Sequence, residues 1–493
     1  MVQPARNRLC TALLILTLGV ACGDSTSTET ASPLSPVFVL GIDGLEWSVL
    51  RPLMEEGRCP NLRGLMERGS YGKLGTFIPT HSPVIWTTVA TGKPKEEHGI
   101  EGFVDRKGRV FTSSRRKGAA LWNIADAYGL TSNVFGWWVT WPVEPVRGVM
   151  ISATSASSMM DKNWKPALMP GLDDQVHPVE LTDRVMALAE EVGTVDAVHA
   201  LAADKVFGDL PSELLTDVER GLIEQSLWSI QSDETYYRLA LDLLPDHQGD
   251  LGMLYLGGTD VVGHRFWRHY EPEAYAWAGA SAELDAALAD VLPRYYEWVD
   301  AMVGELLPLL DDTNLIVCSD HGMHAISTQR DNDRHTTGDH QDGAPGVLIA
   351  AGPDIRAQGG VDRWLGNGAL ASVGQVTDVA PTVLGLLGIP SGRDMRGRVL
   401  SSLLTEEARE QVKTLGRVES HDEGFRDPVM VEMPAEKKGD FVDRMRALGY
   451  LDGGLTSTDA TRPVNPDTFV PDKTMGPGGT AGESAGAGSD SDG

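Results

Sequence analysis

The stretch PVFVLGIDG, residues 36–44, indicates which class of fold this chain adopts. It is a continuous apolar run that ends in Asp43 and Gly44. A run of this kind is typical of a parallel strand that is buried on both faces and is followed by a turn. The pattern returns in GDLGMLYLGGTD, residues 249–260, and in TNLIVCSDHGM, residues 313–323. We therefore expect several buried strands that each end at a polar residue.

Amphipathic helical stretches separate the expected strands. Residues 222–244 precede the second apolar run, and residues 295–310 precede the third. Strands that alternate with such helices indicate an α/β fold with a mostly parallel central sheet and helices on both faces. Residues 155–225 carry a helical pattern and interrupt the alternation, so we interpret them as a helical insertion or cap. Further strands are expected at residues 130–139, 147–153 and 346–355.

Residues 1–21 have the pattern of a secretory signal peptide. Arg6 and Arg8 precede a short apolar run, and Cys22 follows it. The run is too short to span a bilayer, and small residues follow it as at a cleavage site. With residues 22–35 as a flexible tether, the segment resembles a bacterial lipoprotein signal. We expect a lipid anchor at Cys22 in the cell envelope and no other membrane contact. The alternative is a secreted or periplasmic protein that is cleaved nearby.

The rest of the chain divides by composition. Residues 36–405 carry the α/β pattern, residues 406–455 are expected to form a C-terminal helical extension, and residues 456–493 are rich in Gly, Ser, Asp and Pro. Such a tail is expected to be disordered. Two cysteines, Cys59 and Cys318, are too few for a disulfide framework in so long a domain. Cys318 lies in an apolar run and is expected to be a buried free thiol.

The overall charge limits the choice of partner. The chain of 493 residues has 70 acidic and 42 basic residues, which gives a formal net charge of −28. A surface of this sign repels polyanions, so binding of nucleic acid in a basic groove is not expected. A small anionic substrate stays possible, because a bound metal ion can dominate the local field.

Three of the expected strands end in residues that are able to bind metals. Asp43 follows the first apolar run, Asp260 and His264 follow the second, and Asp320 and His321 follow the third. The carboxyl ends of parallel strands share one edge of a sheet, which is where ligands bind in open α/β folds. Three carboxylates and two imidazoles would therefore meet there, and both are ligands for zinc and similar ions. Capping of loops is the simpler reading of a single aspartate, but three such strand ends favour a shared site.

Ser82 has two possible roles. It stands between a histidine and a proline, ahead of the helical run that leads to Gly92. A serine before a helix is most often an N-cap. If the expected ligands meet beside it, Ser82 is instead a nucleophile at the positive end of that helix, where the dipole favours an alkoxide and an anionic phosphate.

Several blocks of the sequence together resemble one family. The blocks occur in the order GIDGLEWSVL, SPVIWTTVATGKPKEEHGI, GGTDVVGH, SDHGM, TGDHQDGAPGVLIAAGPDI and TDVAPTVLGLLGIP. This order resembles the alkaline phosphatase superfamily, and within it the type I phosphodiesterase/nucleotide pyrophosphatase family. The resemblance covers residues 36–405 and implies an alkaline-phosphatase-like catalytic domain.

The resemblance also implies a site of two divalent metal ions, usually zinc, with manganese possible. The first implied metal site has the ligands Asp43, Asp320 and His321, with Ser82 as the nucleophile bound to that metal. The second implied metal site has the ligands Asp260, His264 and His340. His335 is the alternative to His340. The implied activity is hydrolysis of a small phosphate ester of the phosphodiester type through a phosphoseryl intermediate.

The sequence departs from parts of the family pattern. Nucleotide-cleaving members carry a threonine where Ser82 stands, and a matching asparagine for the phosphoryl oxygen is not evident. The Cys/Ser-x-Pro-x-Arg motif of sulfatases is absent, since Pro83 follows Ser82 directly. Two alternatives from the enzyme class are a phosphomonoesterase and a transferase that moves a phospho-group between envelope molecules. From another class, the alternative is a surface binding lipoprotein that has lost catalysis.

Overall fold

The computed structural model describes residues 34–153, 172–278, 281–326, 336–365, 369–423, 425, 429–435, 437–439 and 442. Within these residues, nine strands form one sheet in the order β11-β2-β10-β7-β1-β6-β3-β4-β5. Their bounds are β1 Val37–Ile42, β2 Ser70–Gly75, β3 Ser132–Phe135, β4 Gly148–Ile151, β5 Val176–His177, β6 Leu251–Leu256, β7 Asn314–Cys318, β10 Gly346–Ala351 and β11 Ser372–Gln375. The expected α/β class is confirmed.

The direction of the strands explains how the sheet gathers its polar residues. The neighbours β7, β1, β6, β3 and β4 pair parallel to one another, and β11 is parallel to β2. Only β10 and β5 run against the rest in the described sheet, because β10 pairs antiparallel with both β7 and β2, and β5 pairs antiparallel with β4. The three strands that precede Asp43, Asp260 and Asp320 are thus β1, β6 and β7, which lie side by side at the centre.

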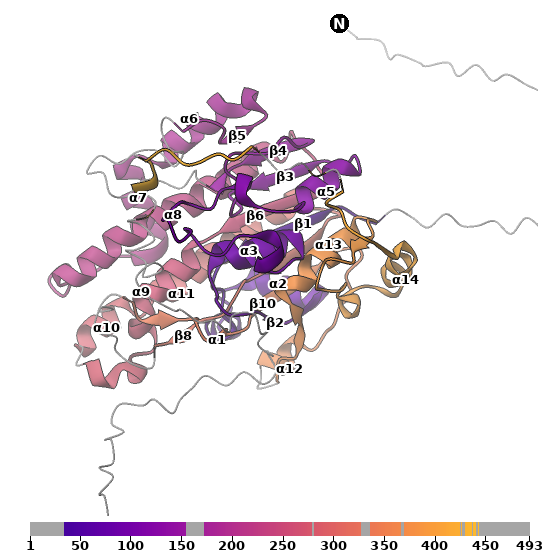
Figure 1. Ribbon diagram of the computed structural model, residues 1–493. Coiled ribbons are helices and arrows are strands. Elements are labelled where there is room, and N and C mark those ends of the chain that lie inside the picture. The colour runs from indigo at the N-terminus through magenta and orange to yellow at the C-terminus, as the bar shows by residue number, and fades with distance from the viewer. Residues whose placement is uncertain are drawn as a thin grey trace, which may run out of the picture. The chain divides into compact units, whose positions relative to one another are not determined.

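Helices cover the sheet (Figure 1). Their bounds are α1 Trp47–Glu55, α2 Pro60–Arg68, α3 Ser82–Thr91, α4 Lys95–His98, α5 Leu121–Ala127, α6 Thr182–Val192, α7 Val195–Ala202, α8 Asp217–Leu243, α9 Gly258–Tyr270, α10 Ala282–Leu288, α11 Val291–Leu306, α12 Val361–Leu365, α13 Val379–Leu386 and α14 Glu406–Leu415. Among the described residues, no helix is both long and apolar enough to cross a bilayer.

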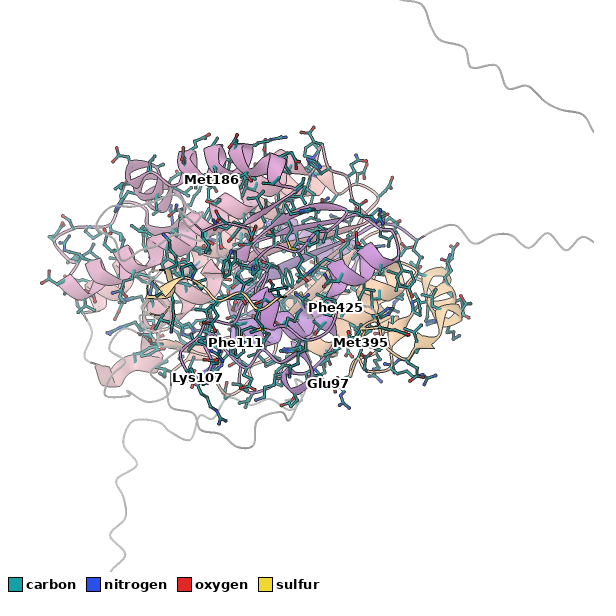
Figure 2. The ribbon with its side chains drawn as sticks, turned by 45° about the horizontal axis from the view of Figure 1, so that its top comes forward. Glu97, Lys107, Phe111, Met186, Met395 and Phe425 are labelled. Atoms are coloured by element: carbon teal, nitrogen blue, oxygen red, sulfur yellow. The ribbon has the colours of Figure 1, made fainter. Side chains whose placement is uncertain are left out.

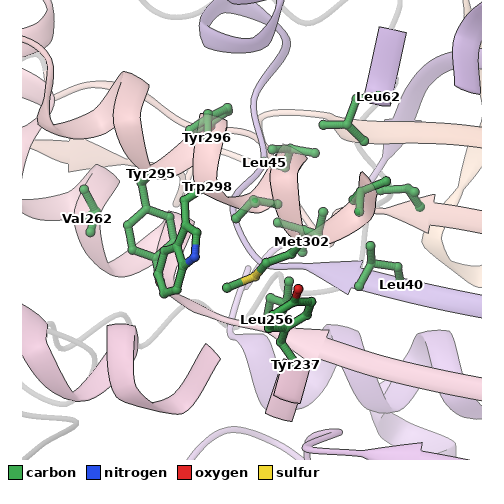
Figure 3. Packing of buried hydrophobic residues seen from close by; sticks show 14 of the residues in the cluster. Leu40, Leu45, Leu62, Tyr237, Leu256, Val262, Tyr295, Tyr296, Trp298 and Met302 are labelled. Carbon is green, nitrogen blue, oxygen red and sulfur yellow. The ribbon is translucent and has the colours of Figure 1, made fainter. Parts of the chain in front are cut away.

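Alternate side chains of β1 point into two separate apolar layers, as expected for a strand buried on both faces. Phe38 and Leu40 belong to a layer that includes α1, α2, α8, α9 and α11. Val37 and Val39 belong to a layer that includes α3, α5 and α13. Figure 3 shows part of the first layer, where Met302 of α11 lies beside Leu256 of β6. Both faces of the sheet are therefore covered by helices.

Some elements of the fold were not predicted from the sequence. The strands β2, β5 and β11 were not expected, since SYGKLG, VH and SVGQ are short and lack long apolar runs. The part of the expected insertion that the structure describes begins at residue 172 and adds β5 to the edge of the sheet before its helices start. In the expected C-terminal extension, α14 is followed by the short strand β13, Arg417–Val418, which pairs with β12, Ser391–Gly392. Residues 1–33 and 456–493 lie outside the described residues.

Cys59 and Cys318 are both buried, and neither forms a disulfide. The expectation for Cys318 is confirmed.

His98 is a buried structural residue at the end of α4. Its Nδ1 accepts a hydrogen bond from the Ile100 amide, and its Nε2 lies 3.2 Å from the Thr88 hydroxyl of α3. Burial, together with the charge of Arg116, lowers the pKa of His98 to about 3. The neutral ring therefore ties the turn after α4 to the helix that begins at Ser82.

Acidification should weaken this contact. The pKa of His98 is lower in the folded protein than the usual 6.5, so its contribution is complete above pH 6.5 and is lost as the pH falls toward 3. We expect the free energy of unfolding of the wild type to fall by about 1.4 kcal/mol per pH unit more than that of His98→Gln in this window. Urea unfolding at pH 6.5, 5.5 and 4.5 measures the difference. The exposed His199 provides the control His199→Gln, which should keep the wild-type slope; equal slopes for all three proteins would contradict the expectation.

Candidate active site

The carboxyl ends of the three central strands meet in one cluster of polar side chains. Asp43 directly follows β1, Asp320 stands two residues after β7, and Asp260 lies in the first turn of α9, which follows β6. All three aspartates are buried, with at most 2% of each residue exposed. The structure therefore brings the three carboxylates together at one edge of the sheet, as expected.

One half of the cluster consists of Asp43, Asp320 and His321. The Nε2 of His321 lies 3.4 Å from Oδ1 of Asp43 and 3.3 Å from Oδ2 of Asp320. Each carboxylate uses its other oxygen for a hydrogen bond, since Trp86 donates to Oδ2 of Asp43 and the Gly44 amide donates to Oδ1 of Asp320. The geometry of these three ligand atoms fits a single metal ion.

The other half consists of Asp260, His264 and His340. Oδ1 of Asp260 lies 3.4 Å from Nε2 of His264 and 3.6 Å from Nε2 of His340, and the two imidazole nitrogens are 3.0 Å apart. Asp260 and His264 share a face of α9, as their spacing of four predicts. Asp260, His340 and His321 also meet the geometric requirement for one metal ion.

His340 reaches this edge because β10 is antiparallel to its neighbours. It stands six residues before β10, at the amino end of that strand. Since β10 runs against β7, its amino end lies at the edge where the parallel strands have their carboxyl ends. The ring of His340 stacks on that of His321 with centroids 3.7 Å apart and an interplanar angle of 10°. His335, the alternative ligand, lies outside the described residues.

All three imidazoles present the same nitrogen to the cluster. Nδ1 of His264 contacts the Gly338 carbonyl at 2.8 Å, and Nδ1 of His321 contacts the Gly322 carbonyl at 3.0 Å. A carbonyl accepts only, so each Nδ1 carries the proton and donates it. Nδ1 of His340 is 2.8 Å from the Thr80 hydroxyl, whose own proton goes to the His340 carbonyl. The Nε2 atoms are therefore left as bare acceptors, as in histidines that bind metals.

A cluster made of acceptors alone is unfavourable without a cation. Oδ1 of Asp43, Oδ2 of Asp320 and Nε2 of His321 are buried and have no hydrogen-bond donor among the described residues. Burial and the neighbouring carboxylates raise the pKa of Asp43, and they raise the pKa of Asp320 well above its usual range. Burial and the adjacent imidazoles lower the pKa of His340. Divalent cations would relieve both the repulsion and the missing hydrogen bonds, so the residues present fit the implied metals.

Ser82 is the first residue of α3 and is buried. The N-cap position belongs to His81, whose carbonyl accepts from the amides of Val84 and Ile85. Ser82 therefore does not occupy the capping position that was the simpler reading of its sequence context. The helix is tied to both halves of the cluster, since Thr80, just before it, contacts His340, and Trp86, one turn into it, donates to Asp43.

Asp43 is held in place by three residues that the sequence pattern did not predict. Oδ2 accepts hydrogen bonds from Trp86 Nε1 at 2.9 Å and from the Tyr255 hydroxyl at 2.6 Å, and the Asp43 carbonyl accepts from the Thr259 hydroxyl. Gly41 makes room for this arrangement, since a Cβ there would lie 2.6 Å from the Trp86 ring. A glycine inside a buried strand was the one available signal that another group approaches closely. With Oδ2 occupied in this way, Oδ1 faces His321.

Three further tryptophans, Trp137, Trp138 and Trp141, follow β3 in the chain. Trp137 is fully buried and Trp141 is 5% exposed. Trp138 is only partly buried and packs edge-on against Phe103 and Tyr255.

Asp233 of α8 holds the start of α9, the helix that carries Asp260. The sequence pattern did not predict this role. It is 1% exposed, and its carboxylate accepts from the amides of Gly257 and Gly258 at 2.8 and 2.9 Å and from the Tyr295 hydroxyl at 2.8 Å. Gly257 and Gly258 form the start of α9, two residues before Asp260. Burial raises the pKa of Asp233 to about 7, so the carboxylate is mostly ionised at pH 8. No periodicity in α8 distinguishes such an aspartate from a surface one.

Replacing Asp233 by asparagine should loosen the start of α9. The amide NH2 would replace one of the two accepting oxygens and face either the Gly257 amide or the Gly258 amide and the Tyr295 hydroxyl, which costs about 1–3 kcal/mol of unfolding free energy. Because the turn orients Asp260, we also expect metal affinity at pH 8 to fall by about 10- to 100-fold. The measurement is metal titration followed by thermal unfolding. The control is Asp242→Asn on the same helix, whose exposed carboxylate pairs with Arg184 at 2.7 Å, and it should change neither quantity much. Unchanged metal affinity in Asp233→Asn would contradict the positioning role.

Two solved structures resemble the chain at low similarity. Human ectonucleotide pyrophosphatase/phosphodiesterase 5 is 14% identical, with a TM-score of 0.41, over 75% of this chain and 100% of that chain. Phosphonoacetate hydrolase from Sinorhizobium meliloti, solved in complex with phosphonoformate, is 18% identical, with a TM-score of 0.33, over 59% of this chain and 57% of that chain. No curated protein matches the sequence.

The family comparison matches more than half of the chain. The family model described as type I phosphodiesterase/nucleotide pyrophosphatase matches residues 37–356, which include all three aspartates, His264, His321, His340 and Ser82. This agrees with the resemblance stated from the sequence blocks. The chain belongs to the type I phosphodiesterase/nucleotide pyrophosphatase family.

Proposed function

We propose that this protein is a metal-dependent phosphodiesterase that hydrolyses a small phosphate diester with Ser82 as its nucleophile. The observation that carries the proposal is the acceptor-only cluster, in which carboxylate oxygens and imidazole Nε2 atoms face one another at 3.0–3.6 Å beside the start of α3. Family membership independently supports hydrolysis of a phosphate ester.

The two halves of the cluster would each hold one divalent cation, zinc or manganese. Asp43, Asp320 and His321 would hold the first, and Asp260, His264 and His340 would hold the second. When bound, the two cations would neutralise charge on the phosphoryl oxygens and lower the pKa of the Ser82 hydroxyl.

Residues of the chain itself hold the proposed metal ligands and the nucleophile in position. Asp43 is held by Trp86 and Tyr255, and His340 is held by Thr80, so each ligand atom is fixed before substrate arrives. The positive end of the α3 dipole lies at Ser82 and favours an anionic phosphoryl group there. Burial of Ser82 and of the surrounding carboxylates removes competing water from this point.

The reaction would proceed in two steps. Ser82 Oγ attacks phosphorus and loses its proton, the bond from phosphorus to the leaving oxygen breaks, and that oxygen departs as an alcohol. Water then attacks the phosphoseryl ester, which releases a phosphate monoester and restores the serine hydroxyl.

Turnover of two chromogenic substrates tests the proposal. With zinc or manganese supplied, bis(p-nitrophenyl) phosphate should be hydrolysed with a higher kcat/KM than p-nitrophenyl phosphate. A preference for the monoester would keep the nucleophile but replace the substrate class by that of a phosphomonoesterase. Transfer of the phosphoryl-linked group to an added alcohol in preference to water would indicate the envelope transferase. No turnover of either compound by protein that holds no metal would favour the surface binding lipoprotein.

A further inference from the structure

A basic pocket lies next to the segment that packs against the candidate active site. It has a volume of about 540 Å³ and is separate from the metal-ligand cluster. Six basic and two acidic side chains contribute to its lining. The charged lining residues are Glu101, Asp105, Arg106, Lys107, Arg109, Arg115, Arg116 and Lys117. The lining therefore carries more basic than acidic side chains, in a chain whose net charge is −28, although Glu144 and Glu432 pair with Arg116 and Arg109 from outside the lining.

A tight hairpin holds part of this positive charge in place. Val104 and Val110 pair across it, and the carboxylate of Asp105 accepts hydrogen bonds from Arg109 Nε at 2.8 Å and Arg115 Nη2 at 2.9 Å. Arg115 also lies over the ring of Phe111, 4.8 Å from its centroid. Figure 2 labels Lys107 and Phe111, which lie close together in that view. The guanidinium groups are therefore oriented before any ligand arrives.

Two arginines of the pocket have a guanidinium nitrogen that makes no hydrogen bond with a described residue, and two lysines have no described acidic partner. Arg116 has 1% of its side chain exposed and directs Nη2 to both oxygens of Glu144, while its buried Nη1 has no hydrogen-bond partner in the described part of the chain. The same is true of Nη1 of Arg115. Lys107 and Lys117 are exposed, and neither forms an ion pair with a described residue. Unpaired donors of this kind favour an oxyanion, which accepts several charge-assisted hydrogen bonds at once.

Two successive contacts connect the pocket with the segment that carries Ser82. Phe103 packs against the ring of His81, the residue before Ser82, with centroids 5.9 Å apart. The carbonyl of Phe103 accepts from the amide of Phe111, which lines the pocket. The pocket-lining Phe111 is therefore connected through Phe103 to the residue next to Ser82.

From this arrangement we propose that the basic pocket binds a second anionic group, a carboxylate or a phosphate, carried by the substrate whose phosphodiester is cleaved at Ser82. The inference rests on the proposed function and narrows its substrate class to diesters that bear a distal oxyanion. Lys107 and Lys117 determine specificity in this scheme, and they take no part in the bond-breaking step.

The first arm of the test is direct binding, which needs no turnover. Equilibrium dialysis of the metal-loaded protein with millimolar inorganic phosphate should find two phosphates per chain, one near Ser82 and one in the basic pocket. The double variant Lys107→Gln, Lys117→Gln should bind one. The control Lys413→Gln removes an exposed charge on α14 and should still bind two. One phosphate per chain in both the wild type and the double variant would overturn the proposal.

The second arm distinguishes a substrate group from free phosphate. The substrates are p-nitrophenyl 3-carboxypropyl phosphate and the same diester with its carboxyl group methylated, which keeps the phosphodiester charge and has no distal anion. Wild type should prefer the carboxylate by about tenfold in kcat/KM, mainly through KM, and the double variant should lose that preference while it cleaves the methylated substrate at the wild-type rate. Equal kcat/KM values in wild type, with two phosphates bound, would reduce the pocket to a site for free phosphate and overturn the substrate claim. Failure to cleave either substrate would refute the proposed function. The number of phosphates bound tests anion binding in the pocket independently of turnover.

Discussion

Ser82→Ala is expected to lower kcat for bis(p-nitrophenyl) phosphate by at least about 10³-fold, because the variant has no hydroxyl to form the phosphoseryl ester. Its metal content should equal that of the wild type, since the six proposed carboxylate and imidazole ligands are untouched. Its stability should also stay within about 0.5 kcal/mol of wild type, because His81 occupies the N-cap position. Loss of an N-cap would instead cost about 1 kcal/mol.

The conservative variant Ser82→Thr is the matched control. It keeps a hydroxyl at the same helix position and should retain measurable turnover. If Ser82→Ala kept wild-type kcat while its metal content was normal, Ser82 would not be the nucleophile. If it lost activity together with metal or stability, a structural role would explain the loss equally well, and intact-mass detection of a phosphorylated Ser82 in wild type would then decide.

Asp320→Asn is expected to have the second large effect, on metal binding. The substitution removes one charge from the half-cluster formed with Asp43 and His321. Loss of partners that only orient a ligand costs 10- to 100-fold in metal affinity, so loss of a ligand should cost at least about 100-fold. Dialysis against a chelator-buffered zinc series measures the change.

The stability of Asp320→Asn relative to the wild type gives a second readout, and this difference should change sign when zinc is added. In chelator, Asp320→Asn should be more stable than wild type at pH 7, because burial and the carboxylates of Asp43 and Asp260 raise the pKa of Asp320 and make its ionised form costly. With saturating zinc the order should reverse, because the wild type gains more binding free energy. The control is Asp300→Asn, a buried aspartate that accepts from the amide of Leu62 at the start of α2; it should destabilise the protein without altering metal affinity. The same stability order with and without zinc would contradict a metal role for Asp320.

The sequence predicted the residues whose chemistry is visible in short blocks. Asp43 and Asp320 follow unbroken apolar runs, and a parallel sheet must bring such ends to one edge. His340 came only from the family resemblance, because its place before a strand gives no reason to expect it at that edge. The antiparallel direction of β10 supplies that reason, and strand direction is set by tertiary packing rather than by local composition.

Residues that orient the ligands were not predicted for a related reason. Trp86, Tyr255 and Asp233 lie in segments whose pattern is that of ordinary core helix or strand. Their roles follow from contacts between elements that are distant in the chain, such as Trp86 and its partner Asp43, which are 43 positions apart. Local periodicity carries no information about such contacts, so they became visible only with the fold.

The most direct measurement is the metal content of the purified wild-type chain by mass spectrometry, after incubation with zinc or manganese and removal of free ion. Two divalent ions per chain, falling to one or none in Asp320→Asn and unchanged in Ser82→Ala, is the predicted result. A wild-type chain that retains no divalent ion under these conditions would contradict the assignment of the aspartate and histidine cluster as a two-metal catalytic site.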